Sequence, residues 1–150
     1  MTNLIIDGSS LMHRTHWVSK SQPLITQDGK NVGDVFIFLR TLKSYINQYS
    51  PNKVYCCWDK KIEYPSVNFR EKLSESVYKG QRDKSLSDEV YANSDIVLDM
   101  VSSLGIKNMY PRTLEADDVI AWLTHRLKGE NIVMSADQDM LQLVSENTIV

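Results

Sequence analysis

Short apolar runs alternate with stretches of helical spacing along the whole chain, and this alternation restricts the fold more than any other feature. Runs of strand length occupy residues 3–6, 53–58, 106–110 and 131–135, and another begins at 148–150. Helical spacing covers 32–49, 88–104, 115–128 and 138–144. Residues 7–10 predict a turn. The pattern predicts an α/β fold, with a mostly parallel central sheet and helices on both faces.

The size and composition predict one domain over residues 1–150. No apolar run approaches the roughly 18 residues that span a bilayer, and the start lacks the pattern of a secretory signal. Cys56 and Cys57 are neighbours inside an apolar run, which excludes a disulfide framework and gives poor spacing for metal ligands. We expect reduced thiols, a cytoplasmic location and no membrane partner.

Acidic residues come after nearly every predicted strand. Seven of them directly follow a strand or open the helix behind one: Asp7, Asp59, Glu115, Asp117, Asp118, Asp137 and Asp139. In a parallel sheet the loops after the strands converge at one edge, which is where ligands bind. Each acid alone is also explained by a turn, or by a helix start where acids favour the helix dipole.

Seven carboxylates at one edge would repel each other by several kcal/mol unless a cation neutralised them. Oxygen ligands favour Mg²⁺ or Mn²⁺ over zinc. Two such ions about 4 Å apart are the usual arrangement for hydrolysing a phosphodiester bond. The acids therefore predict a divalent-metal site.

The net charge of −2 does not exclude a nucleic-acid partner. Setting the seven acids aside leaves 12 of the 19 acidic residues beside 17 basic ones, a balance of +5. The placement of charge therefore matters more than its sum.

Other catalytic chemistries find little support. His13, His16 and His125 have no spacing typical of a triad, and Gly8 belongs to no phosphate-binding motif. A phosphatase or receiver-like domain with an Asp nucleophile is the remaining enzyme alternative. Ser9 stands where such a phosphatase carries a second acid, and no lysine follows a late strand.

A basic stretch with aromatic residues lies between Asp59 and the acidic helix. It spans 68–84 and contains Phe69, Arg70, Lys72, Tyr78, Lys79, Arg82 and Lys84. Such a stretch is often a solvated helix. Beside a carboxylate cluster it could also bind phosphates and stack on an unpaired base.

The ordered set of motifs resembles the 5′-nuclease domain of bacterial DNA polymerase I and the related phage flap endonucleases. The matching stretches are Leu4-Ile-Ile-Asp-Gly-Ser-Ser-Leu-Met-His-Arg14, Trp58-Asp59 with Phe69-Arg70, Tyr78-Lys-Gly-Gln-Arg82, Glu115-Ala-Asp-Asp-Val-Ile120 and Ser135-Ala-Asp-Gln-Asp-Met-Leu-Gln-Leu143. They keep the family's order over nearly the whole chain.

The resemblance implies a PIN-like fold with a mobile arch or clamp at about 62–87. It also implies hydrolysis of 5′-flap or 5′-ended DNA, and of RNA·DNA hybrid, with Mg²⁺ or Mn²⁺, two ions in the complete enzyme. The seven acids would be metal ligands, with Asp7 and Asp117 central to catalysis. Lys79 and Arg82 would contact the scissile phosphate, Arg70 would bind phosphate, and Tyr78 would stack on the displaced base. Arg14 matches as a substrate contact, and a structural salt bridge explains it equally well.

The resemblance also implies a part that these 150 residues do not contain. Members of the family continue into a further Asp pair and a helix–hairpin–helix that binds duplex DNA. We therefore expect either a fragment of a longer nuclease or a C-terminal part on another polypeptide. A module that binds branched nucleic acid without turnover is the alternative function.

Overall fold

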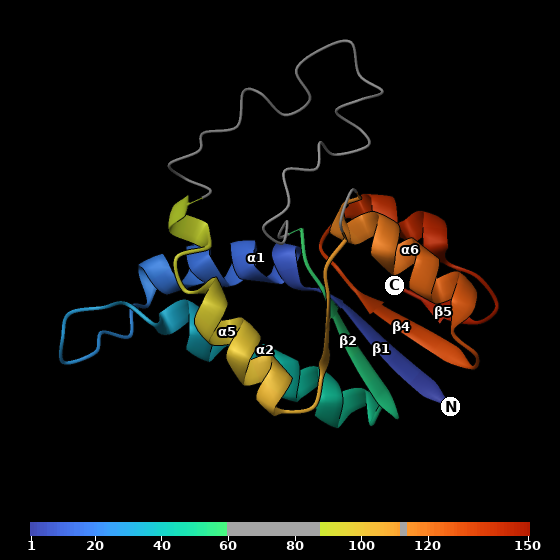
Figure 1. Ribbon diagram of the computed structural model, residues 1–150, viewed down its shortest axis with the longest axis horizontal. Coiled ribbons are helices and arrows are strands. Elements are labelled where there is room, and N and C mark those ends of the chain that lie inside the picture. The colour runs from blue at the N-terminus through green and yellow to red at the C-terminus, as the bar shows by residue number, and fades with distance from the viewer. Residues whose placement is uncertain (60–87, 112–113) are drawn as a thin grey trace, which may run out of the picture.

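The computed structural model describes residues 1–59, 88–111 and 114–150 (Figure 1). Its strands form one parallel sheet in the order β3-β2-β1-β4-β5. They are β1 (Thr2–Asp7), β2 (Lys53–Cys57), β3 (Lys107–Met109), β4 (Glu130–Met134) and β5 (Thr148–Ile149). The helices are α1 (Gly8–Ser21), α2 (Gly33–Tyr49), α5 (Ser94–Ser103), α6 (Ala116–Arg126) and the 3₁₀ helix η1 (Gln138–Leu143). The predicted fold class is confirmed.

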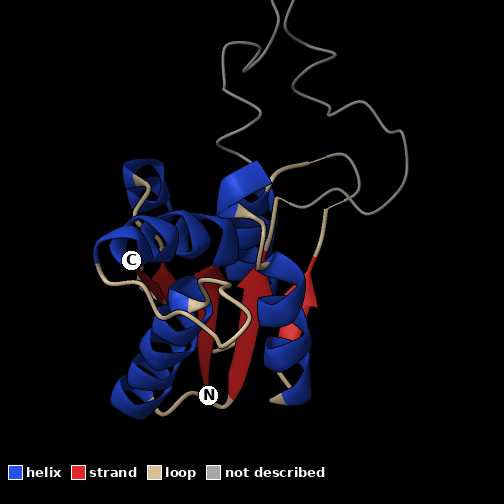
Figure 2. Cartoon of the chain, turned by 90° about the vertical axis from the view of Figure 1, so that its left-hand side faces the viewer, coloured by secondary structure: helices blue, strands red, loops and turns tan. Residues whose placement is uncertain are grey.

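Helices cover both faces of the sheet (Figure 2). Successive side chains of a strand point to opposite faces, so the apolar run of β1 supplies two cores. Leu4 and Ile6 pack in one core with α1, α2 and α5. Ile5 packs in the other with Ile120 and Leu123 of α6. This explains why the strands read as continuous apolar runs.

The turn predicted at residues 7–10 is wrong, because helix α1 begins at Gly8. Asp7 is the N-cap, and its side chain accepts a hydrogen bond from the Ser10 backbone N–H. The buried side of α1 carries several hydroxyls, which hides the helical period. Thr15 donates to the Met12 carbonyl and Ser19 to the His16 carbonyl, so these hydroxyls are satisfied inside the helix.

Two other predicted helices have different extents or geometry. The predicted helix 88–104 is interrupted: residues 88–90 are helical, a turn follows at 91–93, and α5 begins at Ser94. The helix expected at 138–144 is the 3₁₀ helix η1. None of the helices among the described residues is long and apolar enough to cross a membrane.

Candidate metal centre

The sheet register brings the predicted acids to its carboxyl edge. Asp7 ends β1 beside Cys57 of β2, and Ile6 pairs with Met134 of β4, so Ser135 follows next to Asp7. The chain runs from β1 outward to β2 and β3 and then crosses to β4 on the other side of β1. The strand order thus reverses between β1 and β4, the point where open α/β sheets bind ligands.

Asp7 is the most enclosed of the seven acids, at 7% exposure. Its Oδ1 accepts a hydrogen bond from Ser10 N (2.9 Å), and its Oδ2 accepts one from Ser135 Oγ (2.7 Å). Burial raises the pKa of Asp7, these two bonds lower it, and the charges of Asp59 and Asp137 raise it again. The net pKa is raised, because burial outweighs the two hydrogen bonds.

Asp59 links the end of β2 to two helices. Its backbone N–H donates to Ser9 Oγ of α1 (2.8 Å). Its Oδ1 accepts from the backbone N–H of Ala116, the first residue of α6 (2.8 Å). The side chain is otherwise exposed, so Asp59 has an architectural role that its sequence position did not predict.

The three acids at the start of α6 are half-buried. Asp118 Oδ2 accepts from Glu115 N (3.1 Å), and Asp117 Oδ1 accepts from Asp118 N (2.8 Å). The helix-capping interpretation of this motif therefore holds, because Glu115 and Asp118 form a capping box at the start of α6. Capping and metal binding do not exclude each other, because a carboxylate has about four lone-pair positions.

Asp137 and Asp139 lie exposed at the start of η1. Asp137 Oδ1 accepts from Asp139 N (2.9 Å), and Asp137 N donates to Ser135 Oγ (3.1 Å). The loop after β4 is therefore bonded to the same serine hydroxyl as Asp7.

The donor set suits a hard divalent cation, since every predicted ligand supplies oxygen. Within 1–59, 88–111 and 114–150, however, no group of three or more His, Cys, Asp or Glu side chains could hold a metal ion as placed. Asp59 and Asp118 each accept a hydrogen bond from a backbone N–H instead. The buried thiols do not replace them, because burial raises the pKa of Cys57 to about 12 and that of Cys56 well above its usual range.

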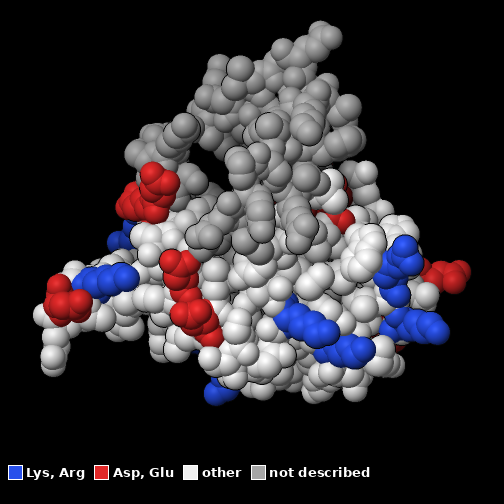
Figure 3. Space-filling view, viewed as in Figure 1, with Lys and Arg blue, Asp and Glu red and all other residues white. Residues whose placement is uncertain are grey.

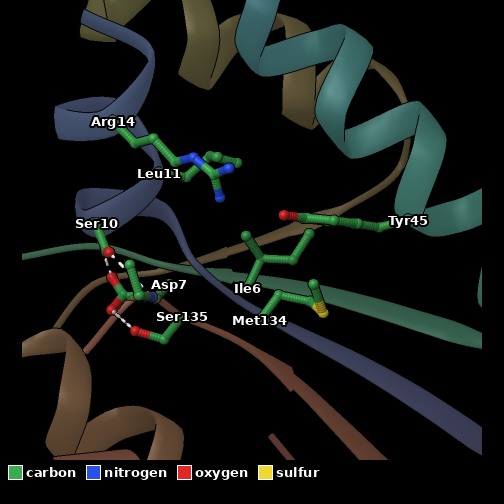
Figure 4. Close-up of a pocket in the computed structure, with 9 residues that line it drawn as sticks. Ile6, Asp7, Ser10, Leu11, Arg14, Tyr45, Met134 and Ser135 are labelled. Atoms are coloured by element: carbon green, nitrogen blue, oxygen red, sulfur yellow. Dashed lines mark hydrogen bonds between the residues drawn. The ribbon is translucent and has the colours of Figure 1, made fainter. Parts of the chain in front are cut away.

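A pocket opens beside Asp7 at the β1–β4 boundary, with a volume of about 120 Å³. Its lining comprises Ile6, Asp7, Ser10, Leu11, Arg14, Tyr45, Met134, Ser135 and Ala136. Figure 4 shows the Arg14 guanidinium reaching over the pocket, with the Tyr45 hydroxyl pointing in from α2. No salt bridge of Arg14 occurs in the described part of the chain.

Sequence reasoning missed Ser10, Tyr45 and Ser135 as site residues. Ser135 could have been found from the sequence, because it comes directly after the apolar residues 132–134, just as Asp7 comes directly after the apolar residues 4–6. Tyr45 gave none, because it fits the apolar spacing of its helix.

Arg70, Tyr78, Lys79 and Arg82 lie outside the described residues, as does the segment 62–87, so their roles stay predictions. Figure 3 shows acidic side chains over α5 and basic ones toward the lower right of the same face. The described residues on this face form no continuous basic surface.

Known protein families match almost the whole of this chain, including the edge that carries the acids. A family model described as the 5′-3′ exonuclease, N-terminal resolvase-like domain matches residues 2–150. DNA polymerase I of Treponema pallidum is 30% identical over 158 residues, covering 99% of this chain and 15% of that protein. The 5′-3′ exonuclease of Aquifex aeolicus is 34% identical over 152 residues, covering 99% of this chain and 50% of that protein. The chain thus spans at most about half the length of these curated relatives.

Solved structures agree on the fold. The bacteriophage T5 D15 protein, co-crystallised with metal ions, superposes with a TM-score of 0.75 at 19% identity, over 99% of this chain and 54% of that one. A T5 D15 flap endonuclease complex with DNA and metal ions gives a TM-score of 0.71 at 20% identity, over 99% of this chain and 53% of that one. With the family model matching almost every residue, the chain belongs to the 5′-3′ exonuclease family, in its N-terminal resolvase-like domain.

Proposed function

We propose that this chain carries the metal-binding part of a magnesium-dependent 5′ nuclease, a flap endonuclease and 5′→3′ exonuclease. It would hydrolyse phosphodiester bonds in DNA, and in RNA·DNA hybrid, during replication or repair. The observation that supports this most is the environment of Asp7. Asp7 ends β1 at the switch point, and its pKa is raised first by burial and then by the charges of Asp59 and Asp137, which come from two other segments.

A divalent ion, Mg²⁺ or Mn²⁺, would relieve this repulsion and supply charge stabilisation at the scissile phosphate. The residues that would hold it are Asp7, Asp59, Glu115, Asp117, Asp118, Asp137 and Asp139. We propose two ions for the complete enzyme. Arg14, which reaches over the pocket, would bind a substrate phosphate, together with Arg70, Lys79 and Arg82, while Tyr78 would stack on a base.

The partners belong to the same proposal. The T5 flap endonuclease was crystallised with DNA, and the relatives extend well beyond the matched part. We infer DNA with a 5′ flap or 5′ end as substrate, and a C-terminal polypeptide part that completes the enzyme. The cytoplasmic location stays a prediction of the sequence.

The test is cleavage of an end-labelled 5′-flap substrate with Mg²⁺, by the chain and by any longer form of the protein. Asp117→Asn and Lys79→Ala should each lower the cleavage rate by roughly 10²–10³-fold, the usual loss when one charge-stabilising group is removed. Lys43→Ala, on the exposed side of α2, is the matched control and should cleave like the parent. If Asp117→Asn and Lys79→Ala both cleave like the parent, the assignment is wrong.

A second candidate is a module that binds branched nucleic acid without turnover. Among the described residues no group of three or more His, Cys, Asp or Glu side chains is placed to hold a metal ion, which favours it. It predicts flap binding that persists in EDTA, with no cleavage under Mg²⁺ or Mn²⁺ at any protein concentration. Metal-dependent cleavage by the chain alone would exclude it.

A further inference from the structure

Ser135 joins two of the acid-bearing segments through one hydroxyl group. It directly follows β4 and is half-buried beside Asp7. Its Oγ donates a hydrogen bond to Asp7 Oδ2 (2.7 Å) and accepts one from Asp137 N (3.1 Å) (Figure 4 shows the first). A single atom thus connects the end of β1 to the loop that carries Asp137 and Asp139.

The direction of both bonds is fixed by chemistry. An ionised carboxylate only accepts and a backbone N–H only donates, so the hydroxyl proton must point at Asp7. A hydroxyl can donate and accept at once, which an alanine methyl cannot. Replacing Ser135 by Ala would remove both links, whereas Thr would keep them.

These links orient the carboxylate of Asp7 before any ligand arrives. Ser10 N holds Oδ1 and Ser135 holds Oδ2, so rotation of the carboxylate is restrained at both oxygens. The same hydroxyl restrains the backbone of Asp137, whose Oδ1 is in turn bonded to Asp139 N. Ser135 therefore sets the position of one acid-bearing segment relative to the other.

We propose that Ser135 is a positioning residue for the divalent-metal site, which ties the carboxylate of Asp7 to the loop that carries Asp137. This inference rests on the proposed function, because it takes Asp7 and Asp137 as metal ligands. Groups that orient metal ligands typically change metal affinity by about 10–100-fold when they are removed. Ser135 would touch neither the ion nor the substrate.

The experiment is a titration of the full 150-residue chain with Mn²⁺ alone, in which the free ion is measured by electron paramagnetic resonance. Ser135→Ala should weaken Mn²⁺ binding by about 10–100-fold, and Ser135→Thr should restore it. Ser145→Ala is the matched control, since that hydroxyl only accepts a long bond from Asn147 N (3.4 Å). It should bind Mn²⁺ like the parent. Circular dichroism in EDTA checks that each variant is folded.

The outcomes separate this inference from the proposed function. If the parent binds Mn²⁺, Asp7→Asn loses it and Ser135→Ala binds like the parent, the positioning role is overturned while the metal site stands. Binding by Ser135→Thr as weak as that of Ser135→Ala also overturns the role, because the hydroxyl would then not be what matters. If the parent binds no Mn²⁺, the metal site fails and the positioning role fails with it.

Discussion

Asp7→Asn should abolish metal-dependent cleavage of a 5′ flap, with a loss of roughly 10³-fold or more. Charge stabilisation by a bound metal supplies several kcal/mol at the transition state, and each 1.36 kcal/mol is about tenfold in rate. Asn has nearly the same shape, and its amide oxygen can still accept the bond from Ser10 N. The measurement is single-turnover cleavage with saturating enzyme and Mg²⁺, in whichever form of the protein cleaves.

The same variant should be more stable than the parent when unfolding is measured in EDTA at neutral pH. The pKa of Asp7 is raised in the folded chain, first by burial, so the folded state holds its proton to higher pH than the unfolded state does. The free energy of unfolding then falls as pH rises from the ordinary Asp range through the raised pKa. The Asn side chain does not titrate, so Asp7→Asn avoids this fall in the free energy of unfolding. At neutral pH without metal it should therefore unfold at a higher temperature than the parent.

The stability difference should disappear as pH falls below the ordinary Asp range, where Asp7 is protonated in both states. Asp99→Asn, an exposed acid on α5, is the control and should change neither cleavage nor the pH profile. An Asp7→Asn variant that cleaves at the parental rate would remove Asp7 from the site.

Gly8→Ala should destabilise the fold by about 1–3 kcal/mol, the usual effect of overpacking a filled core. A Cβ at Gly8 would lie 2.8 Å from two ring carbons of Trp58 and 2.9 Å from Cys56 Sγ. The Trp58 ring cannot retreat easily, because it stacks on Phe38 (5.7 Å between centroids) and its Nε1 donates to Asn108 Oδ1 (2.8 Å). Urea unfolding, followed by tryptophan fluorescence, measures the change.

Ser21→Ala, at the exposed end of α1, is the control for this substitution. It removes only a hydroxyl bond to the Val18 carbonyl and should change stability by less than about 0.5 kcal/mol. Gly8→Ala should also lower cleavage, since moving the start of α1 moves Ser10 N away from Asp7. Equal stability of Gly8→Ala and the parent would show that α1 is not held against Trp58 as the structure has it.

The sharing of one sheet edge by the acids could be predicted, because it depends only on where each acid stands after a strand. Parallel strands end at the same edge, so the position of Asp7, Asp59 or Asp137 after an apolar run is enough to place it there. This placement does not depend on the order of the strands in the sheet. The sequence therefore predicted which acids share an edge, without predicting that Asp7 and Ser135 meet at the switch point.

Helix α1 and the bonds around the acids could not be predicted in the same way. The buried side of α1 includes Thr15 and Ser19, whose polarity hides the helical period. Whether Asp59 binds the start of α6 depends on three-dimensional placement over 57 positions of sequence. The roles of Lys79 and Arg82 depend on residues outside the described part of the chain.

Crystals of the chain soaked in Mn²⁺ show whether this edge of the sheet binds divalent metal through Asp7. We expect an anomalous difference peak in coordinating contact with the Asp7 carboxylate and with a further acid, from the end of β2, the start of α6 or the η1 loop. A map with Mn²⁺ only at other positions, while Asp7 stays bonded to Ser10 and Ser135 alone, would contradict it.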